Sequence, residues 1–409
     1  MAARTSACHT EKIDISRDPA RALGRVLAEH IVADRDDPAF NRSTRDGFAV
    51  RSAEAAPGAR LRLIGESCAG VAFVGSVGAG ECVRILTGAP VPRGADAVVM
   101  QEYAHTDGDF VVIEQAAQQG QNFILAGEHA RTGETVVARG ARLGYAELAM
   151  AAGVGRACVE VFRRPRVAIL SCGDELVPIG CAAEPFEIRN TNSISLAAQV
   201  TLAGGEPAMC GIARDAVDEL RARVEQGLEA DMLVLSGGVA VGKYDLAEQA
   251  LRALGAEFFF DAVAIRPGKP AVFGWCRGKP VFGLPGNPVS TMVTFELFVA
   301  PAIGALSGRM PGPLPLFQAK LAHPINEKAP LTHFIPARVS WRTVTSEANA
   351  GDNSASEIPS TPIVEAVPWE GSGDIGAVVR ANCFLVVYAS RLHLERGEWV
   401  DVLPQRGKF

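Results

Sequence analysis

The chain has 409 residues, of which 48% are hydrophobic and 21% charged, and its net charge is −6 at neutral pH. This composition is typical of a folded protein of several domains, and the lack of a long run of one charge argues against nucleic acid or a membrane surface as the main partner. The nine cysteines include no C-x-x-C pair, the first 20 residues hold no signal-peptide core, and Glu296 and Pro301 interrupt the most apolar stretch. We therefore expect a cytoplasmic protein with reduced thiols and no membrane span.

The N-terminal part of the chain predicts one helix, a β-rich region and a second short helix. Residues 16–33 read as the first helix, with Asp18 as its cap, Pro19 in its first turn and an apolar stripe along one face. From residue 34 to 130, short apolar runs alternate with turn residues, which is typical of short strands. The clearest runs are 61–64, 82–86, 97–100 and 110–113, and a helical segment follows at 145–152.

From residue 166 the pattern changes to strands that alternate with helices. This alternation predicts a doubly wound, mostly parallel sheet. The apolar runs 167–170, 232–235 and 280–282 are the expected strands, and 193–202, 217–228 and 289–306 are the expected helices. After residue 309 the pattern returns to strands, at 334–339, 363–367, 384–388 and 399–403, which predicts a small β domain with a polar loop at 346–360. The predicted fold class is therefore multidomain α/β with additional β domains.

Three glycine- and proline-rich loops follow one another at 236–245, 266–270 and 283–288. Each one alone is a turn signal in any α/β protein. Together they favour a binding site, because glycine lets backbone N–H groups approach an anion closely and the helix expected after the third loop adds a favourable dipole. Arg266 and Lys269 supply positive charge within the second loop, and Asp245 ends the first. We expect one oxyanion site at the strand ends of the parallel sheet.

Several ordered motifs outside these loops resemble one known family. They are the segments 43–50, 86–92, 94–99 and 173–176. Together with the three loops, they are similar to the molybdopterin molybdenumtransferases, the bacterial MoeA and gephyrin E-domain family, over nearly the whole chain. The resemblance implies insertion of molybdate into adenylated molybdopterin, with Mg²⁺-dependent hydrolysis of the adenylate to give molybdenum cofactor and AMP.

The same resemblance implies a homodimer with four domains in each subunit. These are a linking domain (14–33 and 131–163), a β-rich domain (34–130), a molybdopterin-binding α/β domain (1–13 and 164–306) and a C-terminal β domain (307–409). The β-rich domain is expected to reach the active site of the partner subunit. A molybdopterin adenylyltransferase is a further candidate partner.

The resemblance also implies roles for individual residues. Five are expected to be catalytic: Asp46, Thr87, Glu175, Asp215 and Asp245. Of these, Glu175, Asp215 and Asp245 are the expected Mg²⁺ ligands, because Mg²⁺ prefers carboxylate oxygens. The residues expected to bind molybdopterin or molybdate are Ser236, Gly237, Gly238, Arg266, Lys269, Pro285, Gly286, Asn287, Pro288, Arg338 and Ser372. Structural alternatives remain for some of them: Asp46 as a turn residue, Glu175 near a helix start, Asp215 as a helix cap and Thr87 as a turn stabiliser.

The sequence departs from the family pattern at a few positions. Pro336 stands where the family has an arginine linked with molybdate, and Ala262 where some members have lysine. Arg338 lies two residues beyond Pro336, on the same face of the predicted strand. In the first loop, Ala240 replaces a usual serine and Lys243 a common acidic residue. These changes bear on molybdate handling, and the choice between molybdate and tungstate and the recipient enzyme stay open.

Two rival functions remain beside the transferase. One is a molybdopterin adenylyltransferase, which shares the α/β domain, although the long β-rich and C-terminal regions argue against it. The other is a catalytically weak paralogue that binds molybdopterin as a scaffold. Pro336 and Ala262 favour that alternative, while the retained carboxylates argue against it.

Overall fold

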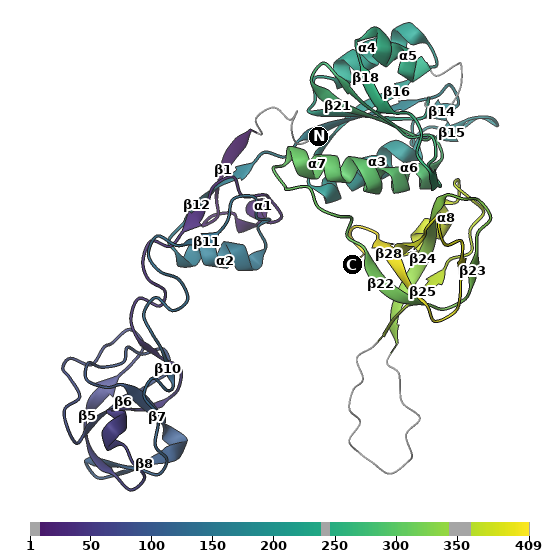
Figure 1. Cartoon of the computed structure of the whole chain (residues 1–409). Helices are drawn as coiled ribbons and strands as arrows, with labels where there is room; N and C mark the ends of the chain where they lie inside the picture. The colour runs from purple at the N-terminus through teal and green to yellow at the C-terminus, as the bar shows by residue number, and fades with distance from the viewer. Residues whose placement is uncertain (1–8, 239–245, 343–360, 409) are drawn as a thin grey trace. The chain divides into compact units, whose positions relative to one another are not determined.

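The computed structural model describes residues 9–238, 246–342 and 361–408. The chain divides into two compact units, which are described separately (Figure 1). The larger unit comprises residues 1–11, 24–26 and 162–409, and the smaller unit comprises residues 12–23 and 27–161. The division into four domains remains a prediction.

The smaller unit contains the β-rich region. Its six-stranded sheet has the order β7-β4-β6-β5-β9-β8, formed by Ala97–Met100, Gly47–Val50, Glu81–Ile85, Arg60–Ser67, Phe110–Ile113 and Ala104–Asp107. Four of these strands fall on the apolar runs that the sequence marked. Gly47 is required in β4, because a Cβ there would lie 1.9 Å from the carbonyl oxygen of Val99 on the adjacent strand. A second core in this unit holds α2 (Tyr145–Gly153) against the short pair β2 (Ile31–Val32) and β11 (Thr135–Val137).

The predicted helix over 16–33 is wrong in its length. Helix α1 runs only from Pro19 to Ala22, with the Asp18 carboxylate accepting a hydrogen bond from the Arg21 N–H at 3.2 Å, as expected of the cap. Gly24 has φ of 76°, a left-handed conformation that ends a helix. The later apolar residues therefore leave the helix, and Ile31 begins β2.

The larger unit is built on a six-stranded sheet with the order β16-β13-β17-β21-β20-β18. The strands are Glu206–Ala213, Arg166–Cys172, Met232–Ser236, Lys279–Leu284, Val272–Cys276 and Glu257–Phe260. The first four are parallel, and β20 and β18 add an antiparallel edge. The predicted mostly parallel, doubly wound sheet is confirmed.

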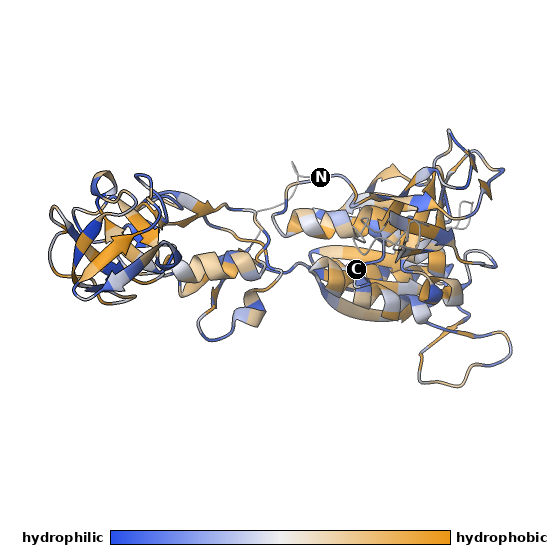
Figure 2. Ribbon diagram, turned by 90° about the horizontal axis from the view of Figure 1, so that it is seen from below, coloured by the Kyte–Doolittle hydropathy of each residue, from blue (hydrophilic) through white to orange (hydrophobic). Residues whose placement is uncertain are grey.

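Helices cover both faces of this sheet. On one face, α4 (Val217–Gly227) and α5 (Leu246–Ala253) enclose a core that includes Leu220, Val224 and Leu235. On the other face, α3 (Thr191–Ala203) packs beside the segment Pro288–Leu306 over Ile169 and Val234. The strands of this sheet are coloured mostly as hydrophobic in Figure 2, as expected of a sheet covered on both faces.

The segment Pro288–Leu306 consists of α6 (Pro288–Thr294), a π-helical turn (Phe295–Val299) and α7 (Ala300–Leu306). By length and composition it is apolar enough to cross a membrane, but 67% of its apolar window is buried inside the protein, as in a core helix. The π-helical turn contains Glu296, which is only 5% exposed. Its carboxylate accepts hydrogen bonds from Arg406 Nε at 2.6 Å and from Gln199 Nε2 at 3.1 Å.

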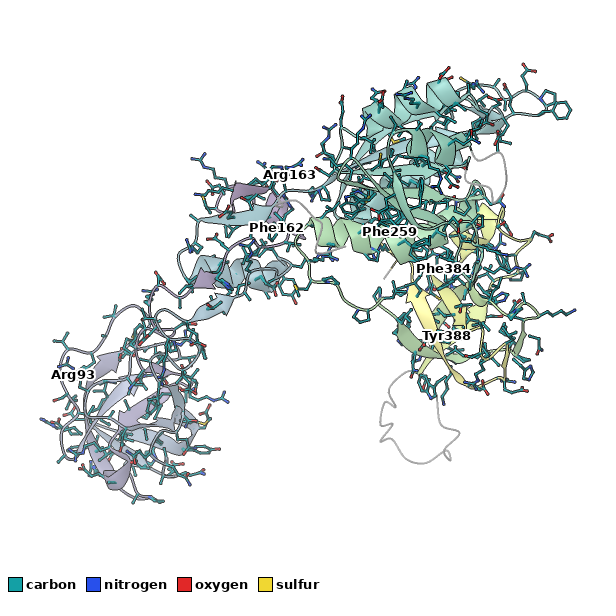
Figure 3. The ribbon with its side chains drawn as sticks, turned by 45° about the horizontal axis from the view of Figure 1, so that its top comes forward. Arg93, Phe162, Arg163, Phe259, Phe384 and Tyr388 are labelled. Atoms are coloured by element: carbon teal, nitrogen blue, oxygen red, sulfur yellow. The ribbon has the colours of Figure 1, made fainter. Side chains whose placement is uncertain are left out.

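The C-terminal region forms a second six-stranded sheet in the larger unit, with the order β19-β24-β25-β22-β28-β26. Its strands are Ile265–Arg266, Thr332–Arg342, Thr361–Ala366, Phe317–Leu321, Trp399–Pro404 and Cys383–Val387. An additional pairing between β24 and β26 closes it into a barrel. The short helix α8 (Ile375–Arg380) packs against β24. Phe384, which is labelled in Figure 3, lies in a cluster with Val289 and Val293 of α6.

Candidate functional site

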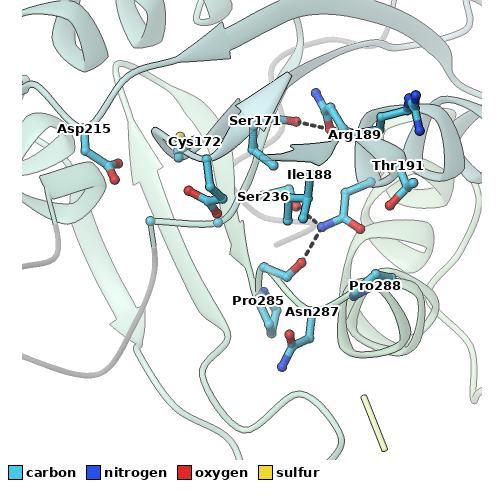
Figure 4. Close-up of a pocket in the computed structure, with 18 of the residues that line it drawn as sticks. Ser171, Cys172, Ile188, Arg189, Thr191, Asp215, Ser236, Pro285, Asn287 and Pro288 are labelled. Atoms are coloured by element: carbon cyan, nitrogen blue, oxygen red, sulfur yellow. Dashed lines mark hydrogen bonds between the residues drawn. The ribbon is translucent and has the colours of Figure 1, made fainter. Parts of the chain in front are cut away.

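A cavity of about 440 Å³ lies at the carboxyl ends of β13, β17 and β21 in the larger unit (Figure 4). Its wall includes Ser171 and Cys172 at the end of β13, Ser236 at the end of β17 and Pro285 just after β21. Ligands of open α/β sheets bind at this edge, because successive strand ends and the loops that follow them converge there. The position agrees with the site expected from the three loops.

The first and third loops meet in this cavity because β17 and β21 are neighbours in the sheet. Gly237 and Gly238 follow Ser236 with φ of 83° and 69°. A Cβ on Gly237 would lie 2.4 Å from the carbonyl oxygen of Cys172, so no other residue fits without a backbone shift. The backbone at Gly286 runs alongside, since a Cβ there would lie 3.7 Å from the Cα of Gly237.

A buried polar network supports this wall of the cavity. Asn192 Nδ2 donates to Ser236 Oγ at 2.8 Å and to the Gly286 carbonyl at 2.7 Å, which ties α3 to both glycine loops. Ser171 Oγ donates to Asn190 Oδ1 at 3.0 Å, and the same carboxamide oxygen caps α3 at the Ser193 N–H. The Asn192 side chain is 9% exposed, and its Oδ1 has no hydrogen-bond partner in the described part of the chain. This network was not predicted from the sequence, although Asn190 and Asn192 directly before the predicted helix 193–202 were the available signal.

Two of the predicted metal ligands, Glu175 and Asp215, line the same cavity. Burial raises the pKa of Asp215, and the charges of Asp174 and Glu175 add to the effect. The alternative role of Asp215 as a helix cap is wrong, because Ala216 is the N-cap residue of α4. Asp245 lies outside the described residues, as do Ala240 and Lys243, and within the described ranges no group of three or more His, Cys, Asp or Glu side chains is placed to hold a metal ion.

The second loop contributes Pro270 to the wall, but the lining does not include Arg266 or Lys269. Both of those side chains are exposed. Arg266 lies in β19, which pairs with β24 of the C-terminal sheet, so this loop leads towards the C-terminal region.

The C-terminal region contacts the wall of the cavity through Ser372, which is not itself a lining residue. Asn287, which lines the cavity, donates from Nδ2 to Ser372 Oγ at 2.9 Å, and the Val289 N–H donates to the Ser372 carbonyl at 2.9 Å. Arg338 is exposed on β24 and is not part of the lining. It lies close to Lys408, whose pKa is lowered by burial and then by the charge of Arg338.

The smaller unit brings Asp46 and Thr87 together. Thr87 donates to Asp46 Oδ1 twice, from its backbone N–H at 2.6 Å and from Oγ1 at 2.7 Å. These two bonds lower the pKa of the Asp46 carboxyl, so it is ionised over the physiological range. The pair is therefore a fixed carboxylate and hydroxyl on a solvent-accessible loop.

Comparisons with known proteins cover the chain in three matched regions. Residues 1–155 match the "MoeA N-terminal region (domain I and II)", residues 168–305 a "Probable molybdopterin binding domain" and residues 318–405 the "MoeA C-terminal region (domain IV)". The molybdopterin molybdenumtransferase of Staphylococcus aureus is 33% identical over 389 residues, which cover 94% of this chain and 89% of that protein. That of Bacillus subtilis is 33% identical over 393 residues, covering 93% and 87%. A crystal structure of the molybdopterin biosynthesis MoeA protein from Pyrococcus horikoshii aligns over 97% of this chain and 94% of its own, with 32% identity and a TM-score of 0.72.

Proposed function

The chain belongs to the MoeA family of molybdopterin molybdenumtransferases, and from that membership we propose the reaction it performs. It inserts molybdate into adenylated molybdopterin, and the phosphoanhydride of the adenylate is hydrolysed so that AMP leaves. The observation that carries this proposal is the cavity at the strand ends, where two glycine loops, a buried asparagine network and two carboxylates converge. Such a wall offers backbone N–H groups to phosphate oxygens and carboxylates to a divalent ion.

The donor set on one side of the cavity fits Mg²⁺. Glu175 and Asp215 are carboxylates, and the raised pKa of Asp215 reflects burial beside other negative charges, which a divalent cation would relieve. When bound, Mg²⁺ would neutralise charge on the phosphates. We assign Asp245 as the third ligand from the family resemblance alone, because it lies outside the described residues.

We propose that the C-terminal region helps to bind molybdate, the second substrate. Ser372 supports this role, because its hydroxyl contacts Asn287 at the cavity edge. Arg338, Arg266 and Lys269 remain candidate cations for the oxyanion, although the first lies beside Lys408 and the other two lie outside the lining. A tetrahedral dianion needs such charge-assisted donors when the chain carries a net charge of −6.

We further propose a cytoplasmic homodimer in which the Asp46–Thr87 pair serves the active site of the partner subunit, with a molybdopterin adenylyltransferase supplying the substrate. The contact between Thr87 and Asp46 supports a preformed catalytic pair. Light scattering should report about twice 43.1 kDa. A monomer at micromolar concentration would contradict the shared site.

The deciding experiment is turnover with adenylated molybdopterin, molybdate and Mg²⁺. AMP release and the activation of a cofactor-free molybdoenzyme are measured for the wild type and for Glu175→Gln. We expect AMP release and activation of the molybdoenzyme with the wild type, and the loss of both with Glu175→Gln.

A second candidate is a molybdopterin-binding scaffold with weak catalysis. Pro336 in place of the family arginine, together with the position of Arg338 beside Lys408, favours it. Tight molybdopterin binding without AMP release would select this second function.

A further inference from the structure

We propose that Arg189 binds a phosphate group of the substrate in the strand-end cavity, opposite the carboxylates. This inference deepens the proposed function and rests on it. It assigns the cation of the cavity to a residue outside the three glycine and proline loops.

The charges in the cavity wall are separated. Glu175 and Asp215 are its negative side chains, and Arg189 is the one positive side chain among the described residues that line it. Asp215 and Arg189 lie on opposite sides of the cavity, with Ser171, Cys172 and Ile188 between them (Figure 4). A ligand with more than one phosphate group would therefore meet carboxylates on one side, which would need a cation between them and the phosphate, and an arginine on the other.

Arg189 is an exposed residue of the cavity wall whose side chain is oriented by one hydrogen bond to the backbone. Arg189 ends β15 (Ile188–Arg189), which pairs in parallel with β14 (Leu176–Val177). Its Nε donates to the Cys181 carbonyl at 3.2 Å, and its two terminal nitrogens make no hydrogen bond within the described residues. No ion pair of Arg189 with a carboxylate occurs elsewhere in the described chain. The planar fork of arginine donors matches two oxygens of one phosphate.

The residues that follow Arg189 add donors and an unsatisfied acceptor. Thr191 and Asn192 occupy the first positions of α3, a helix of 13 residues, where N–H groups have no intrahelical acceptor and the helix dipole favours an anion. Independently, Asn192 lines the cavity with a side chain that is nine-tenths buried and an Oδ1 without a partner in the described residues. A buried acceptor of this kind is completed by an O–H or N–H of a ligand.

This arrangement suits the chemistry of the adenylate. Water adds to one phosphorus, the P–O bond of the anhydride breaks, and its electron pair stays on the oxygen of the departing phosphate while a proton passes to solvent. Two phosphomonoesters result, one on AMP and one on molybdopterin. Arg189 stabilises the negative charge that develops on one of these groups.

The experiment compares phosphorylated ligands with their dephosphorylated forms. The ligands are AMP, adenosine, an oxidised fluorescent molybdopterin derivative that keeps its phosphomonoester, and the same pterin after phosphatase treatment. Affinities are measured by calorimetry and fluorescence for the wild type, Arg189→Gln, Arg189→Lys and Arg221→Gln. Arg221 is an exposed residue of α4 outside the cavity lining, so its variant controls for the loss of one positive charge.

Arg189→Gln should raise the Kd of one phosphorylated ligand about tenfold, which corresponds to about 1.4 kcal/mol, and leave the Kd of its dephosphorylated form unchanged. Arg189→Lys should lose less, and Arg221→Gln should match the wild type. The ligand that responds, AMP or the pterin, identifies which phosphate Arg189 holds.

Two results would overturn the assignment: wild-type affinity of Arg189→Gln for both phosphorylated ligands, or equal losses with and without the phosphate. Failure of the proposed function has a different signature. If the wild type binds no pterin but binds AMP in an Arg189-dependent manner, the phosphate site stands and the proposed reaction fails. If the wild type binds none of the four ligands, both fail.

Discussion

Replacing Gly237 by alanine should damage the cavity through one identifiable contact. Gly237 has φ of 83°, and a Cβ there would lie 2.4 Å from the Cys172 carbonyl oxygen, well inside the 3.0 Å below which Cβ contacts are essentially never found. The obstructing atom belongs to the backbone of β13, which is paired with a strand on each side and has little freedom to move. We therefore expect the glycine loop, and not β13, to be displaced.

A matched glycine separates the two costs of this substitution. Gly255 has φ of 82°, and nothing lies within 4 Å of a Cβ built there. Alanine at either position adopts the left-handed conformation at a cost of about 1–2 kcal/mol. Only Gly237→Ala adds a steric overlap, for which overpacking in proteins typically costs about 1–3 kcal/mol. Gly237→Ala should thus lose about 1–3 kcal/mol more stability than Gly255→Ala.

Hydrogen–deuterium exchange over a urea series measures this difference, because peptides from β13 and β17 report the unfolding of this sheet separately from the rest. The affinity for the phosphorylated pterin, measured by titration, reports whether the glycine loop keeps its conformation. We expect Gly237→Ala to lose pterin affinity and Gly255→Ala to keep it. Equal destabilisation of the two variants, or wild-type pterin binding by Gly237→Ala, would refute the steric argument.

Three further predictions follow from single contacts. Asp215→Asn should raise the melting temperature of the metal-free protein at neutral pH, because the raised pKa of Asp215 means that its ionisation costs stability above that pKa. The gain should shrink as the pH falls through that pKa and vanish at the lower pKa of the unfolded chain. Mg²⁺ should protect the variant from melting less than it protects the wild type. Thr87→Val should raise the pKa of Asp46, seen in an NMR titration, because one of the two bonds that lower this pKa is lost. Since a lowered pKa stabilises the folded state above the unfolded value, the variant should be slightly less stable near neutral pH, and an unmoved titration would show that the backbone bond alone suffices. Arg406→Met should cost about 3 kcal/mol in urea unfolding because it leaves the 5%-exposed Glu296 without its ion-pair partner, whereas adding Glu296→Met should restore most of the loss; a double variant as unstable as the single one would contradict this.

The sequence predicted most strands and the place of the cavity for a common physical reason. Buried parallel strands need continuous apolar runs, and β13 and β17 contain the predicted runs 167–170 and 232–235. The first and third loops meet because the carboxyl ends of parallel strands share one edge, a rule that needs no side-chain detail.

The features that sequence reasoning missed depend on local backbone geometry. The apolar stripe of the predicted first helix continues past Gly24, but the left-handed conformation of Gly24 ends α1. The spacing of apolar residues does not reveal such a backbone conformation. Arg189 was missed because β14 and β15 are two residues long each, below the length at which a strand pattern can be recognised. Arg266 was predicted to bind the oxyanion because it is a cation in the second loop. Its strand pairs with the C-terminal sheet, which the sequence of the loop does not show.

The attachments of the C-terminal sheet have a mechanical consequence. It is joined to the α/β part by the chain after Leu306, by the pairing of β19 with β24, by Arg406 at the π-helical turn and by Ser372 at the start of α6. A domain that is attached at one point can rotate about that point. Attachments at α6, at the π-helical turn and at β19 do not share one axis about which the C-terminal sheet could rotate. The C-terminal sheet is therefore held at several separate points, and the contact of Ser372 with Asn287 keeps it next to the cavity wall.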